Sequence, residues 1–221
     1  MSQAVSTAAW LWLAVVASGL YHGLNPAMGW PLAVSAGLME KSPRALFAAL
    51  GPLAVGHLLA IFAMLLPFGL LLGLAEWRRE IQLAAATVVI GFGVFRLFDR
   101  RHPRSLARIP PAQLGLWSFA IAIAHGAGLM LVPIYLGLCR AEASDDMAAG
   151  RLVEGNLGVA ILVALVHVIA MIGAGGCLAW LVYRYLGLKF VSRSWFNLDA
   201  VWAISLILVG AIALALNLGY D

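Results

Sequence analysis

The amino-acid sequence predicts an all-α, polytopic membrane protein, on two observations of composition and one of pattern. Of the 221 residues, 63% are hydrophobic and only 11% are charged, a composition outside the range of soluble domains. Apolar runs long enough to cross the ~30 Å hydrocarbon core of a bilayer recur along the chain. No segment is long and polar enough to fold as a separate soluble domain. We therefore expect residues 1–221 to form a single transmembrane domain.

Six apolar runs are separated by short turns that contain charged residues or proline. They cover residues 8–39, 45–75, 81–98, 114–138, 156–185 and 195–218. The first run is too long for one straight span, because 32 residues of continuous helix would rise about 48 Å. Asn25-Pro26 lies near its middle, and proline removes a backbone donor and disfavours helical geometry in the preceding residue. We predict that the first helix is broken at Asn25-Pro26.

The two halves of the chain resemble each other. In each half a His-Gly pair is followed by a methionine and a proline, and a second histidine lies 35 or 42 residues beyond the first. This pattern matches His22 with His125, and His57 with His167. Because each half has three spans, the halves would insert with opposite orientations. The prediction is a pair of inverted three-helix repeats, a plan found in many transporters.

Basic residues predict the orientation. Five arginines lie between Arg96 and Arg108, and short loops rich in lysine and arginine stay in the cytoplasm. We therefore expect a multi-pass protein of the plasma (inner) membrane with both termini outside. The repeats, about 8–98 and about 114–218, would be joined by this basic cytoplasmic loop, residues 99–113. The net charge of +4 then reflects orientation, and no nucleic-acid partner is expected.

Four of the five histidines fall near the middle of their spans, namely His22, His57, His125 and His167. Ionisable residues at that depth are costly and face a bundle interior or a cavity. Neutral imidazoles can ligate a metal ion, relay protons or hold a haem iron. The structural alternative is that each histidine bonds a neighbouring carbonyl and locks helix packing. We predict that the four histidines are metal ligands.

Residues beside these histidines are expected to line the path of the substrate: Asn25, Pro26, Met28, Met130 and Met171. Thioethers suit soft ions such as Cu(I), although methionine is also a common filler of apolar contacts. No carboxylate is expected near the middle of the membrane, which argues against an oxygen cage for Ca²⁺ or Mg²⁺. It also argues against a Ser-His-acid triad. We expect no catalytic residues, and a transporter rather than an enzyme.

The stretch G-L-Y-H-G-L-N-P-A-M, followed after a basic turn by G-H-L-L-A-I, resembles the first two spans of the NicO/UreH-type nickel and cobalt permeases. These belong to a LysE/DsbD-like superfamily of six-span transporters. They carry an H-x-x-D-P-D-H-like segment in an early span and a Gly-His pair in the next. His22 matches the first histidine, Asn25-Pro26 matches the Asp-Pro, and His57 matches the later histidine. The resemblance covers about fifty residues closely and implies membership of this transporter superfamily, without identifying the substrate.

The metal motif departs from that family. Its acidic positions are Asn25 and Ala27 here, and its closing histidine is Met28, which weakens the expectation of Ni²⁺ or Co²⁺. The same segment also looks like thiol-disulfide transporters of the CcdA/DsbD type. Their reactive cysteine would fall at Ala27, so that chemistry is absent.

These features predict a permease whose midplane histidine cluster binds or transports a transition-metal ion, with Cu, Zn, Ni and Co as candidates. One alternative is a membrane-bound haem or metal-centre redox protein, for which Gly23 and Gly126 would leave room beside their histidines. Another is a non-catalytic subunit of a larger membrane complex. The expected partners are the lipid bilayer and a small ion or small molecule, and a helix face that binds lipid would equally suit a homo-oligomer.

Overall fold

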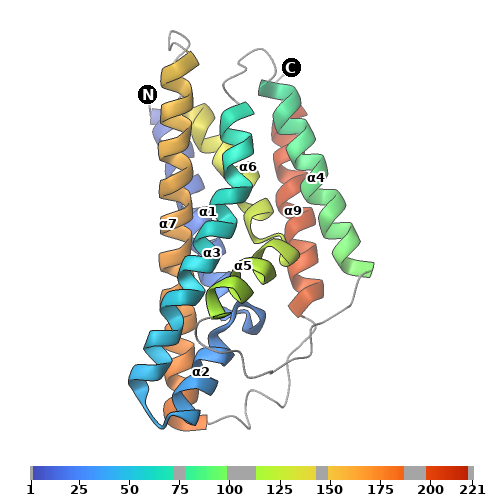
Figure 1. The fold of residues 1–221 in the computed structure, drawn as a ribbon. Coiled ribbons are helices and arrows are strands. Elements are labelled where there is room, and N and C mark those ends of the chain that lie inside the picture. Colours follow the sequence, from blue (N-terminus) through green and yellow to red (C-terminus); the bar gives the residue numbers. More distant parts are fainter. Residues whose placement is uncertain (1, 72–77, 99–112, 143–148, 187–197, 219–221) are drawn as a thin grey trace.

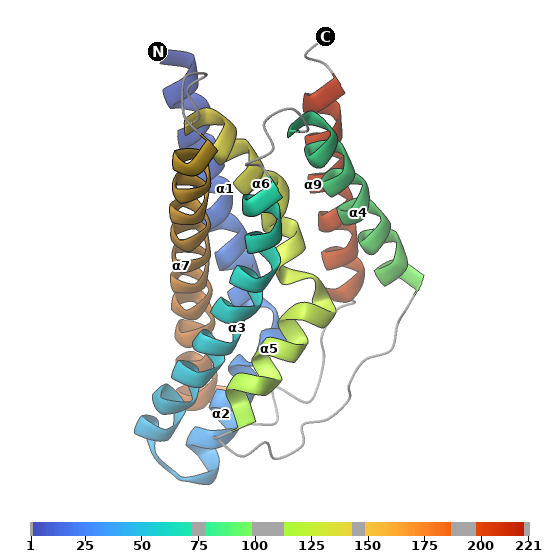
Figure 2. The ribbon, with the colours of Figure 1, turned by 45° about the horizontal axis from the view of Figure 1, so that its top comes forward.

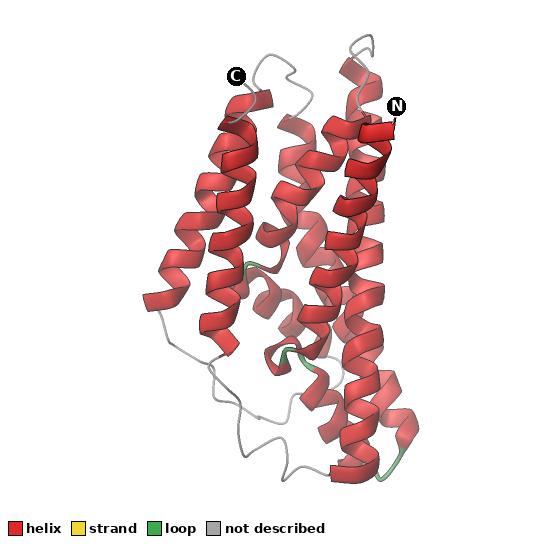
Figure 3. Ribbon diagram, turned by 180° about the vertical axis from the view of Figure 1, so that it is seen from behind, coloured by secondary structure: helices red, strands yellow, loops and turns green. Residues whose placement is uncertain are grey.

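The computed structural model describes residues 2–71, 78–98, 113–142, 149–186 and 198–218. Over these ranges the chain is all-helical and contains no strand (Figure 3), as the composition predicts.

The first helix is broken where the sequence predicts. Helix α1 (Ser2–Leu24) is followed by a 3₁₀ turn, η1 (Pro26–Met28), and by α2 (Trp30–Met39). Proline begins the 3₁₀ turn, and Gly29 then adopts a φ of 102°, which lies in the left-handed region that glycine reaches without steric cost. The break therefore follows from local backbone chemistry.

The next four helices contain a second break, which the sequence analysis did not predict. Helix α3 (Pro43–Leu71) and helix α4 (Arg78–Phe98) are followed by α5 (Leu114–His125) and α6 (Ala127–Glu142). The run 114–138, expected as one continuous span, is instead bent by 65° between α5 and α6. The cause is Gly126, which has a φ of 69° and ends α5 with N–H bonds to two preceding carbonyls.

The chain ends with α7 (Ala149–Leu181), a π-helical turn η4 (Val182–Leu186) and α9 (Leu198–Leu218). Three segments are long and apolar enough to cross a membrane, and the bent α5–α6 pair makes a fourth if it is counted as one span. Large apolar side chains are exposed on the outer faces of α1, α3 and α7, among them Trp10, Leu59 and Ile169. Such surfaces are typical of contact with lipid.

The helices form an upright bundle (Figure 1). Helix α1 packs on α7, and α3 packs on α5, α6 and α7. Helices α4 and α9 form an antiparallel pair at one side of this group, which Figures 1 and 2 both show. The first turn of α1 and the last turn of α9 lie at the same end of the bundle, and the turn between α2 and α3 lies at the other (Figure 2).

The α4–α9 contact is reciprocal. A Cβ added to Gly93 would lie 2.9 Å from the carbonyl oxygen of Ala203, and one added to Gly210 would lie 3.0 Å from that of Ala86. Each glycine also meets an isoleucine of the other helix. The same offset of 117 positions relates all three pairs: Ala86 with Ala203, Ile90 with Ile207, and Gly93 with Gly210.

Two glycines of α3 provide a matched test of helix packing. A Cβ on Gly56 would collide with the carbonyl oxygen of Gly115 in α5, whereas one on Gly51 would meet nothing within 4 Å. We expect Gly56→Ala to destabilise the protein by ~1–3 kcal/mol, because rigid backbone must move. Gly51→Ala should be neutral or stabilising by up to ~1 kcal/mol, because alanine favours the helix. Unfolding by SDS in mixed micelles measures both, and equal stabilities would contradict the packing.

Candidate metal centre

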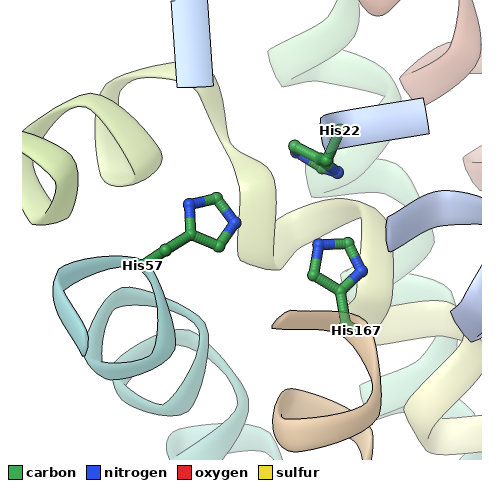
Figure 4. Close-up of side chains that lie close together, drawn as sticks. All are labelled: His22, His57 and His167. Atoms are coloured by element: carbon green, nitrogen blue, oxygen red, sulfur yellow. The ribbon is translucent and has the colours of Figure 1, made fainter. Parts of the chain in front are cut away.

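Three buried histidines converge from three helices. His22 lies in the last turn of α1, His57 in α3 and His167 in α7, and their imidazoles point toward one another (Figure 4). Their exposed fractions are 0%, 1% and 0%. One ring nitrogen from each lies within 4.8 Å of the other two. The structure therefore gathers three of the four predicted ligands into one group.

Close approach of α1 to α7 brings His22 to His167. Gly19 and Gly23 are one turn apart on α1 and both face α7. A Cβ on Gly19 would lie 2.8 Å from the Cβ of Ala170, and one on Gly23 would collide with the carbonyl oxygen of Met171. This Gly-x-x-x-Gly spacing lets two helix backbones approach closely. The sequence analysis did not use this spacing, which was visible in the segment G-L-Y-H-G.

Ser18 holds two of the three imidazoles. His22 donates from Nδ1 to the carbonyl oxygen of Ser18 at 3.2 Å. Because a carbonyl only accepts, this bond leaves the lone pair of His22 on Nε2. The hydroxyl of the same serine lies 2.9 Å from Nδ1 of His167. Bonds of this kind orient metal-ligating histidines, and the bond to the carbonyl also fixes the tautomer of His22. Sequence reasoning missed Ser18 in this role, although it lies one turn before His22.

The ring nitrogens of the site suit a metal ion. Nε2 of His57 and Nε2 of His167 are buried without a hydrogen-bond partner among the residues that the structure describes. A buried polar atom in that condition costs roughly 1–3 kcal/mol. Around a tetrahedral ion with bonds of ~2.0–2.1 Å, ligand nitrogens are about 3.4 Å apart. Nitrogens now within 4.8 Å of one another could reach that spacing by small side-chain rotations.

The three rings lie close together, at the distances of packed aromatic side chains. The rings of His57 and His167 are nearly parallel, at 7°, with centroids 5.8 Å apart. The ring of His22 is steeply inclined to both, with centroid distances of 5.5 Å and 4.8 Å. Neutral imidazoles are good ligands for Zn, Cu and Ni. Among the residues that the structure describes, the group consists of histidines alone.

His125, the fourth predicted ligand, is the last residue of α5 and is buried. It donates from Nδ1 to the carbonyl oxygen of Ile121 at 3.0 Å. It does not belong to the group of three, and its ligation stays a prediction.

The expected path residues separate into three places. Asn25 and Pro26 form the break itself, where the carbonyl of Asn25 accepts from the N–H of Met28 at 3.0 Å. Met28 and Met171 are buried and line one hollow beside the histidines. Met130 lies elsewhere, in an apolar cluster with residues of α4 and α9.

Trp30 secures the break, a role that sequence reasoning did not find. Its indole Nε1 donates to the carbonyl oxygen of Leu24 at 3.3 Å, one of the carbonyls that the end of α1 leaves without a helical partner. Trp30 is 3% exposed. The bond therefore satisfies a freed backbone group inside the bundle, where lipid offers no partner.

Two apolar clusters enclose the histidines along the bundle. One contains Ile61 and Leu65, which follow His57 on α3. The other contains Leu50 and Leu53, which precede it. In this conformation the three imidazoles are closed off from solvent, as their exposed fractions show.

The two glycines beside the histidines are packed against other helices. A Cβ on Gly23 would collide with Met171, and one on Gly126 would collide with the ring of Phe92. The haem alternative stays a prediction.

Comparisons of the chain with protein-family models, curated proteins and solved structures gave no match. The fold and the site themselves define the class, which is an all-helical protein with helices long and apolar enough to cross a membrane and with a buried group of three histidines that could hold a metal ion.

The bonds of Ser18 lead to a test with a matched control. We expect Ser18→Ala to lower the affinity for Zn²⁺ by about 10–100-fold, the usual effect of removing a partner of a metal-bound histidine. Ser35→Ala is the control, because that hydroxyl donates to the sulfur of Met39, at the far end of α2, at 3.7 Å. Titration calorimetry on the detergent-purified protein measures both affinities. Equal affinities would show that Ser18 does not orient the ligands.

Proposed function

We propose that this protein is a permease that binds a transition-metal ion at His22, His57 and His167 and carries it across the membrane. The observation that carries the proposal is the convergence of three buried imidazoles from three helices. Intramembrane ionisable residues normally mark a path for an ion or substrate. Their nitrogens suit Zn, Cu, Ni or Co, and the absence of a carboxylate from the group disfavours Ca²⁺ and Mg²⁺.

The proposal includes six spans in two inverted repeats. Helices α4 and α9 have 21 residues each, so each rises ~32 Å, enough for one crossing. The reciprocal glycine contacts between them are those of a two-fold relation. Both broken helices support the same relation, since each break closely follows one of the matched histidines, His22 or His125.

Helix packing agrees with this plan. If the two halves are exchanged, α1 against α7 becomes the α5–α6 pair against α3, and both contacts are present. Broken helices that meet at the centre of the membrane are the usual ion and substrate sites of inverted-repeat transporters. The closed conformation then corresponds to an occluded state, and relative movement of the repeats would open either side. The resemblance to NicO/UreH-type permeases fits this reading.

The ligands are tested by conservative substitution. We expect the purified wild-type protein to bind about one equivalent of Zn²⁺. His57→Gln or His167→Gln should weaken binding by more than ~100-fold, beyond the 10–100-fold typical of second-shell partners. The matched control is His125→Gln, for which we expect a loss below ~10-fold.

Transport is measured with the same variants as uptake of ⁶⁵Zn²⁺ into proteoliposomes, with ⁶⁴Cu(I) under reducing conditions as the second ion. Uptake should fall with binding in His57→Gln and stay high in His125→Gln. Normal binding and uptake in the His57 and His167 variants would refute the proposed function. That result would favour the alternative in which the histidines only stabilise helix packing in a subunit of a membrane complex.

Orientation in the plasma (inner) membrane, with both termini outside, is part of the proposal and rests on the positions of the arginines. We expect a cysteine replacing Ser2 to react with a membrane-impermeant maleimide on intact cells. One replacing the exposed Lys41, in the turn after α2, should react only after the cells are opened. Both would be made after replacing the two native cysteines, Cys139 and Cys177. The reverse labelling pattern would mean that the arginine-rich side faces out.

A further inference from the structure

A small hollow is lined by residues that neighbour the histidines in the chain, although no histidine is itself on the described lining. Its lining includes Gly23, Met28, Trp30, Met171 and Gly175. Gly23 directly follows His22, and Met171 lies four residues after His167, about one helical turn along the same face of α7. An ion leaving the histidines toward the α2 end of the bundle would therefore meet this hollow next.

Two glycines on the lining let α7 pack closely against its neighbours beside the hollow. A Cβ on Gly175 would lie 3.0 Å from the carbonyl oxygen of Gly23 and 3.6 Å from the Cβ of Trp30. A Cβ on Gly176 would lie 3.2 Å from a methyl group of Leu50. The hollow is therefore bordered by closely packed parts of α1, α2, α3 and α7.

Thioether sulfur is the metal-binding group that side chains bring to this hollow. Met28 and Met171 are 5% and 2% exposed, and they reach the hollow from the 3₁₀ turn and from α7. The other residues on its described lining are glycines, aliphatic residues and Trp30. The indole N–H of Trp30 donates to the carbonyl oxygen of Leu24. Thioethers select soft ions such as Cu(I) over Zn²⁺ or Ni²⁺.

The charge of the histidine group also favours Cu(I). The histidine group is neutral when its nitrogens are free to ligate, and it contains no carboxylate. Any ion held there keeps its full charge in a buried setting. Because the cost of desolvating an ion scales with the square of its charge, a divalent ion would cost roughly four times as much as a monovalent one. A monovalent ion is therefore the better fit to this site.

Building on the proposed function, we propose that the hollow is a second binding site for the transported ion, with Met28 and Met171 as thioether ligands. We further propose that the transported ion is Cu(I), which is soft and monovalent. The ion passes between imidazole nitrogen and thioether sulfur without changing its oxidation state, so no electron donor or acceptor is needed.

The test uses the full chain purified in mild detergent and kept reducing. Wild-type protein loaded with two equivalents of Cu(I) should show both nitrogen and sulfur neighbours by copper X-ray absorption. The double variant Met28→Leu/Met171→Leu, a swap close to isosteric, should lose the sulfur contribution. Its uptake of ⁶⁴Cu(I) into proteoliposomes should fall at least tenfold, while its affinity for Zn²⁺ stays unchanged.

Met130→Leu is the matched control, because Met130 is also buried but packs in a different cluster. It should keep wild-type Cu(I) uptake and the sulfur signal. Copper with nitrogen neighbours alone in the wild-type protein would overturn this inference, and so would undiminished Cu(I) uptake in the double variant. Neither result touches the proposed function, which fails separately if His57→Gln and His167→Gln leave Zn²⁺ binding and uptake intact.

Discussion

The structure depends on one constraint: a polar group inside an apolar bundle must find its partner within the protein. The end of α1 at Leu24 frees carbonyl groups, and Trp30 satisfies one of them. The backbone of Asn25 bonds to both sides of the break. These local solutions stabilise a helix end within the bundle, and that helix end carries His22 to the other two histidines. The site forms because backbone groups at the break find hydrogen-bond partners within the protein.

The fold class and much of the site could be predicted from the sequence. Hydropathy predicts an all-helical membrane protein, and Pro26 predicts the first break because proline acts locally, whatever surrounds it. The depth of each histidine in its span was sufficient to bring His22, His57 and His167 together as candidates. Depth could not separate them from His125, because membership of the group depends on how helices are rotated against one another.

The remaining features required packing information. Gly126 breaks the α5–α6 run through a left-handed φ, but a glycine in an apolar run is equally common in straight membrane helices. The role of Ser18 could not be predicted from the sequence. A serine one turn before a histidine becomes part of the site only when a second helix brings His167 to it. The relation between α4 and α9 was hidden for a similar reason. Their shared Ala-x-x-x-Ile-x-x-Gly spacing is recognisable only after the contact is seen.

The double role of Ser18 has a mechanical consequence. Its carbonyl bonds His22 on its own helix, whereas its hydroxyl meets His167 across the helix interface. A displacement of α1 away from α7 would carry His22 and the hydroxyl with it. One movement would then remove a ligand and release the orientation of another, with α3 and α7 at rest. Such a movement would occur at the contact that Gly19 and Gly23 make with α7. The affinity for the ion would therefore depend directly on the position of α1 against α7.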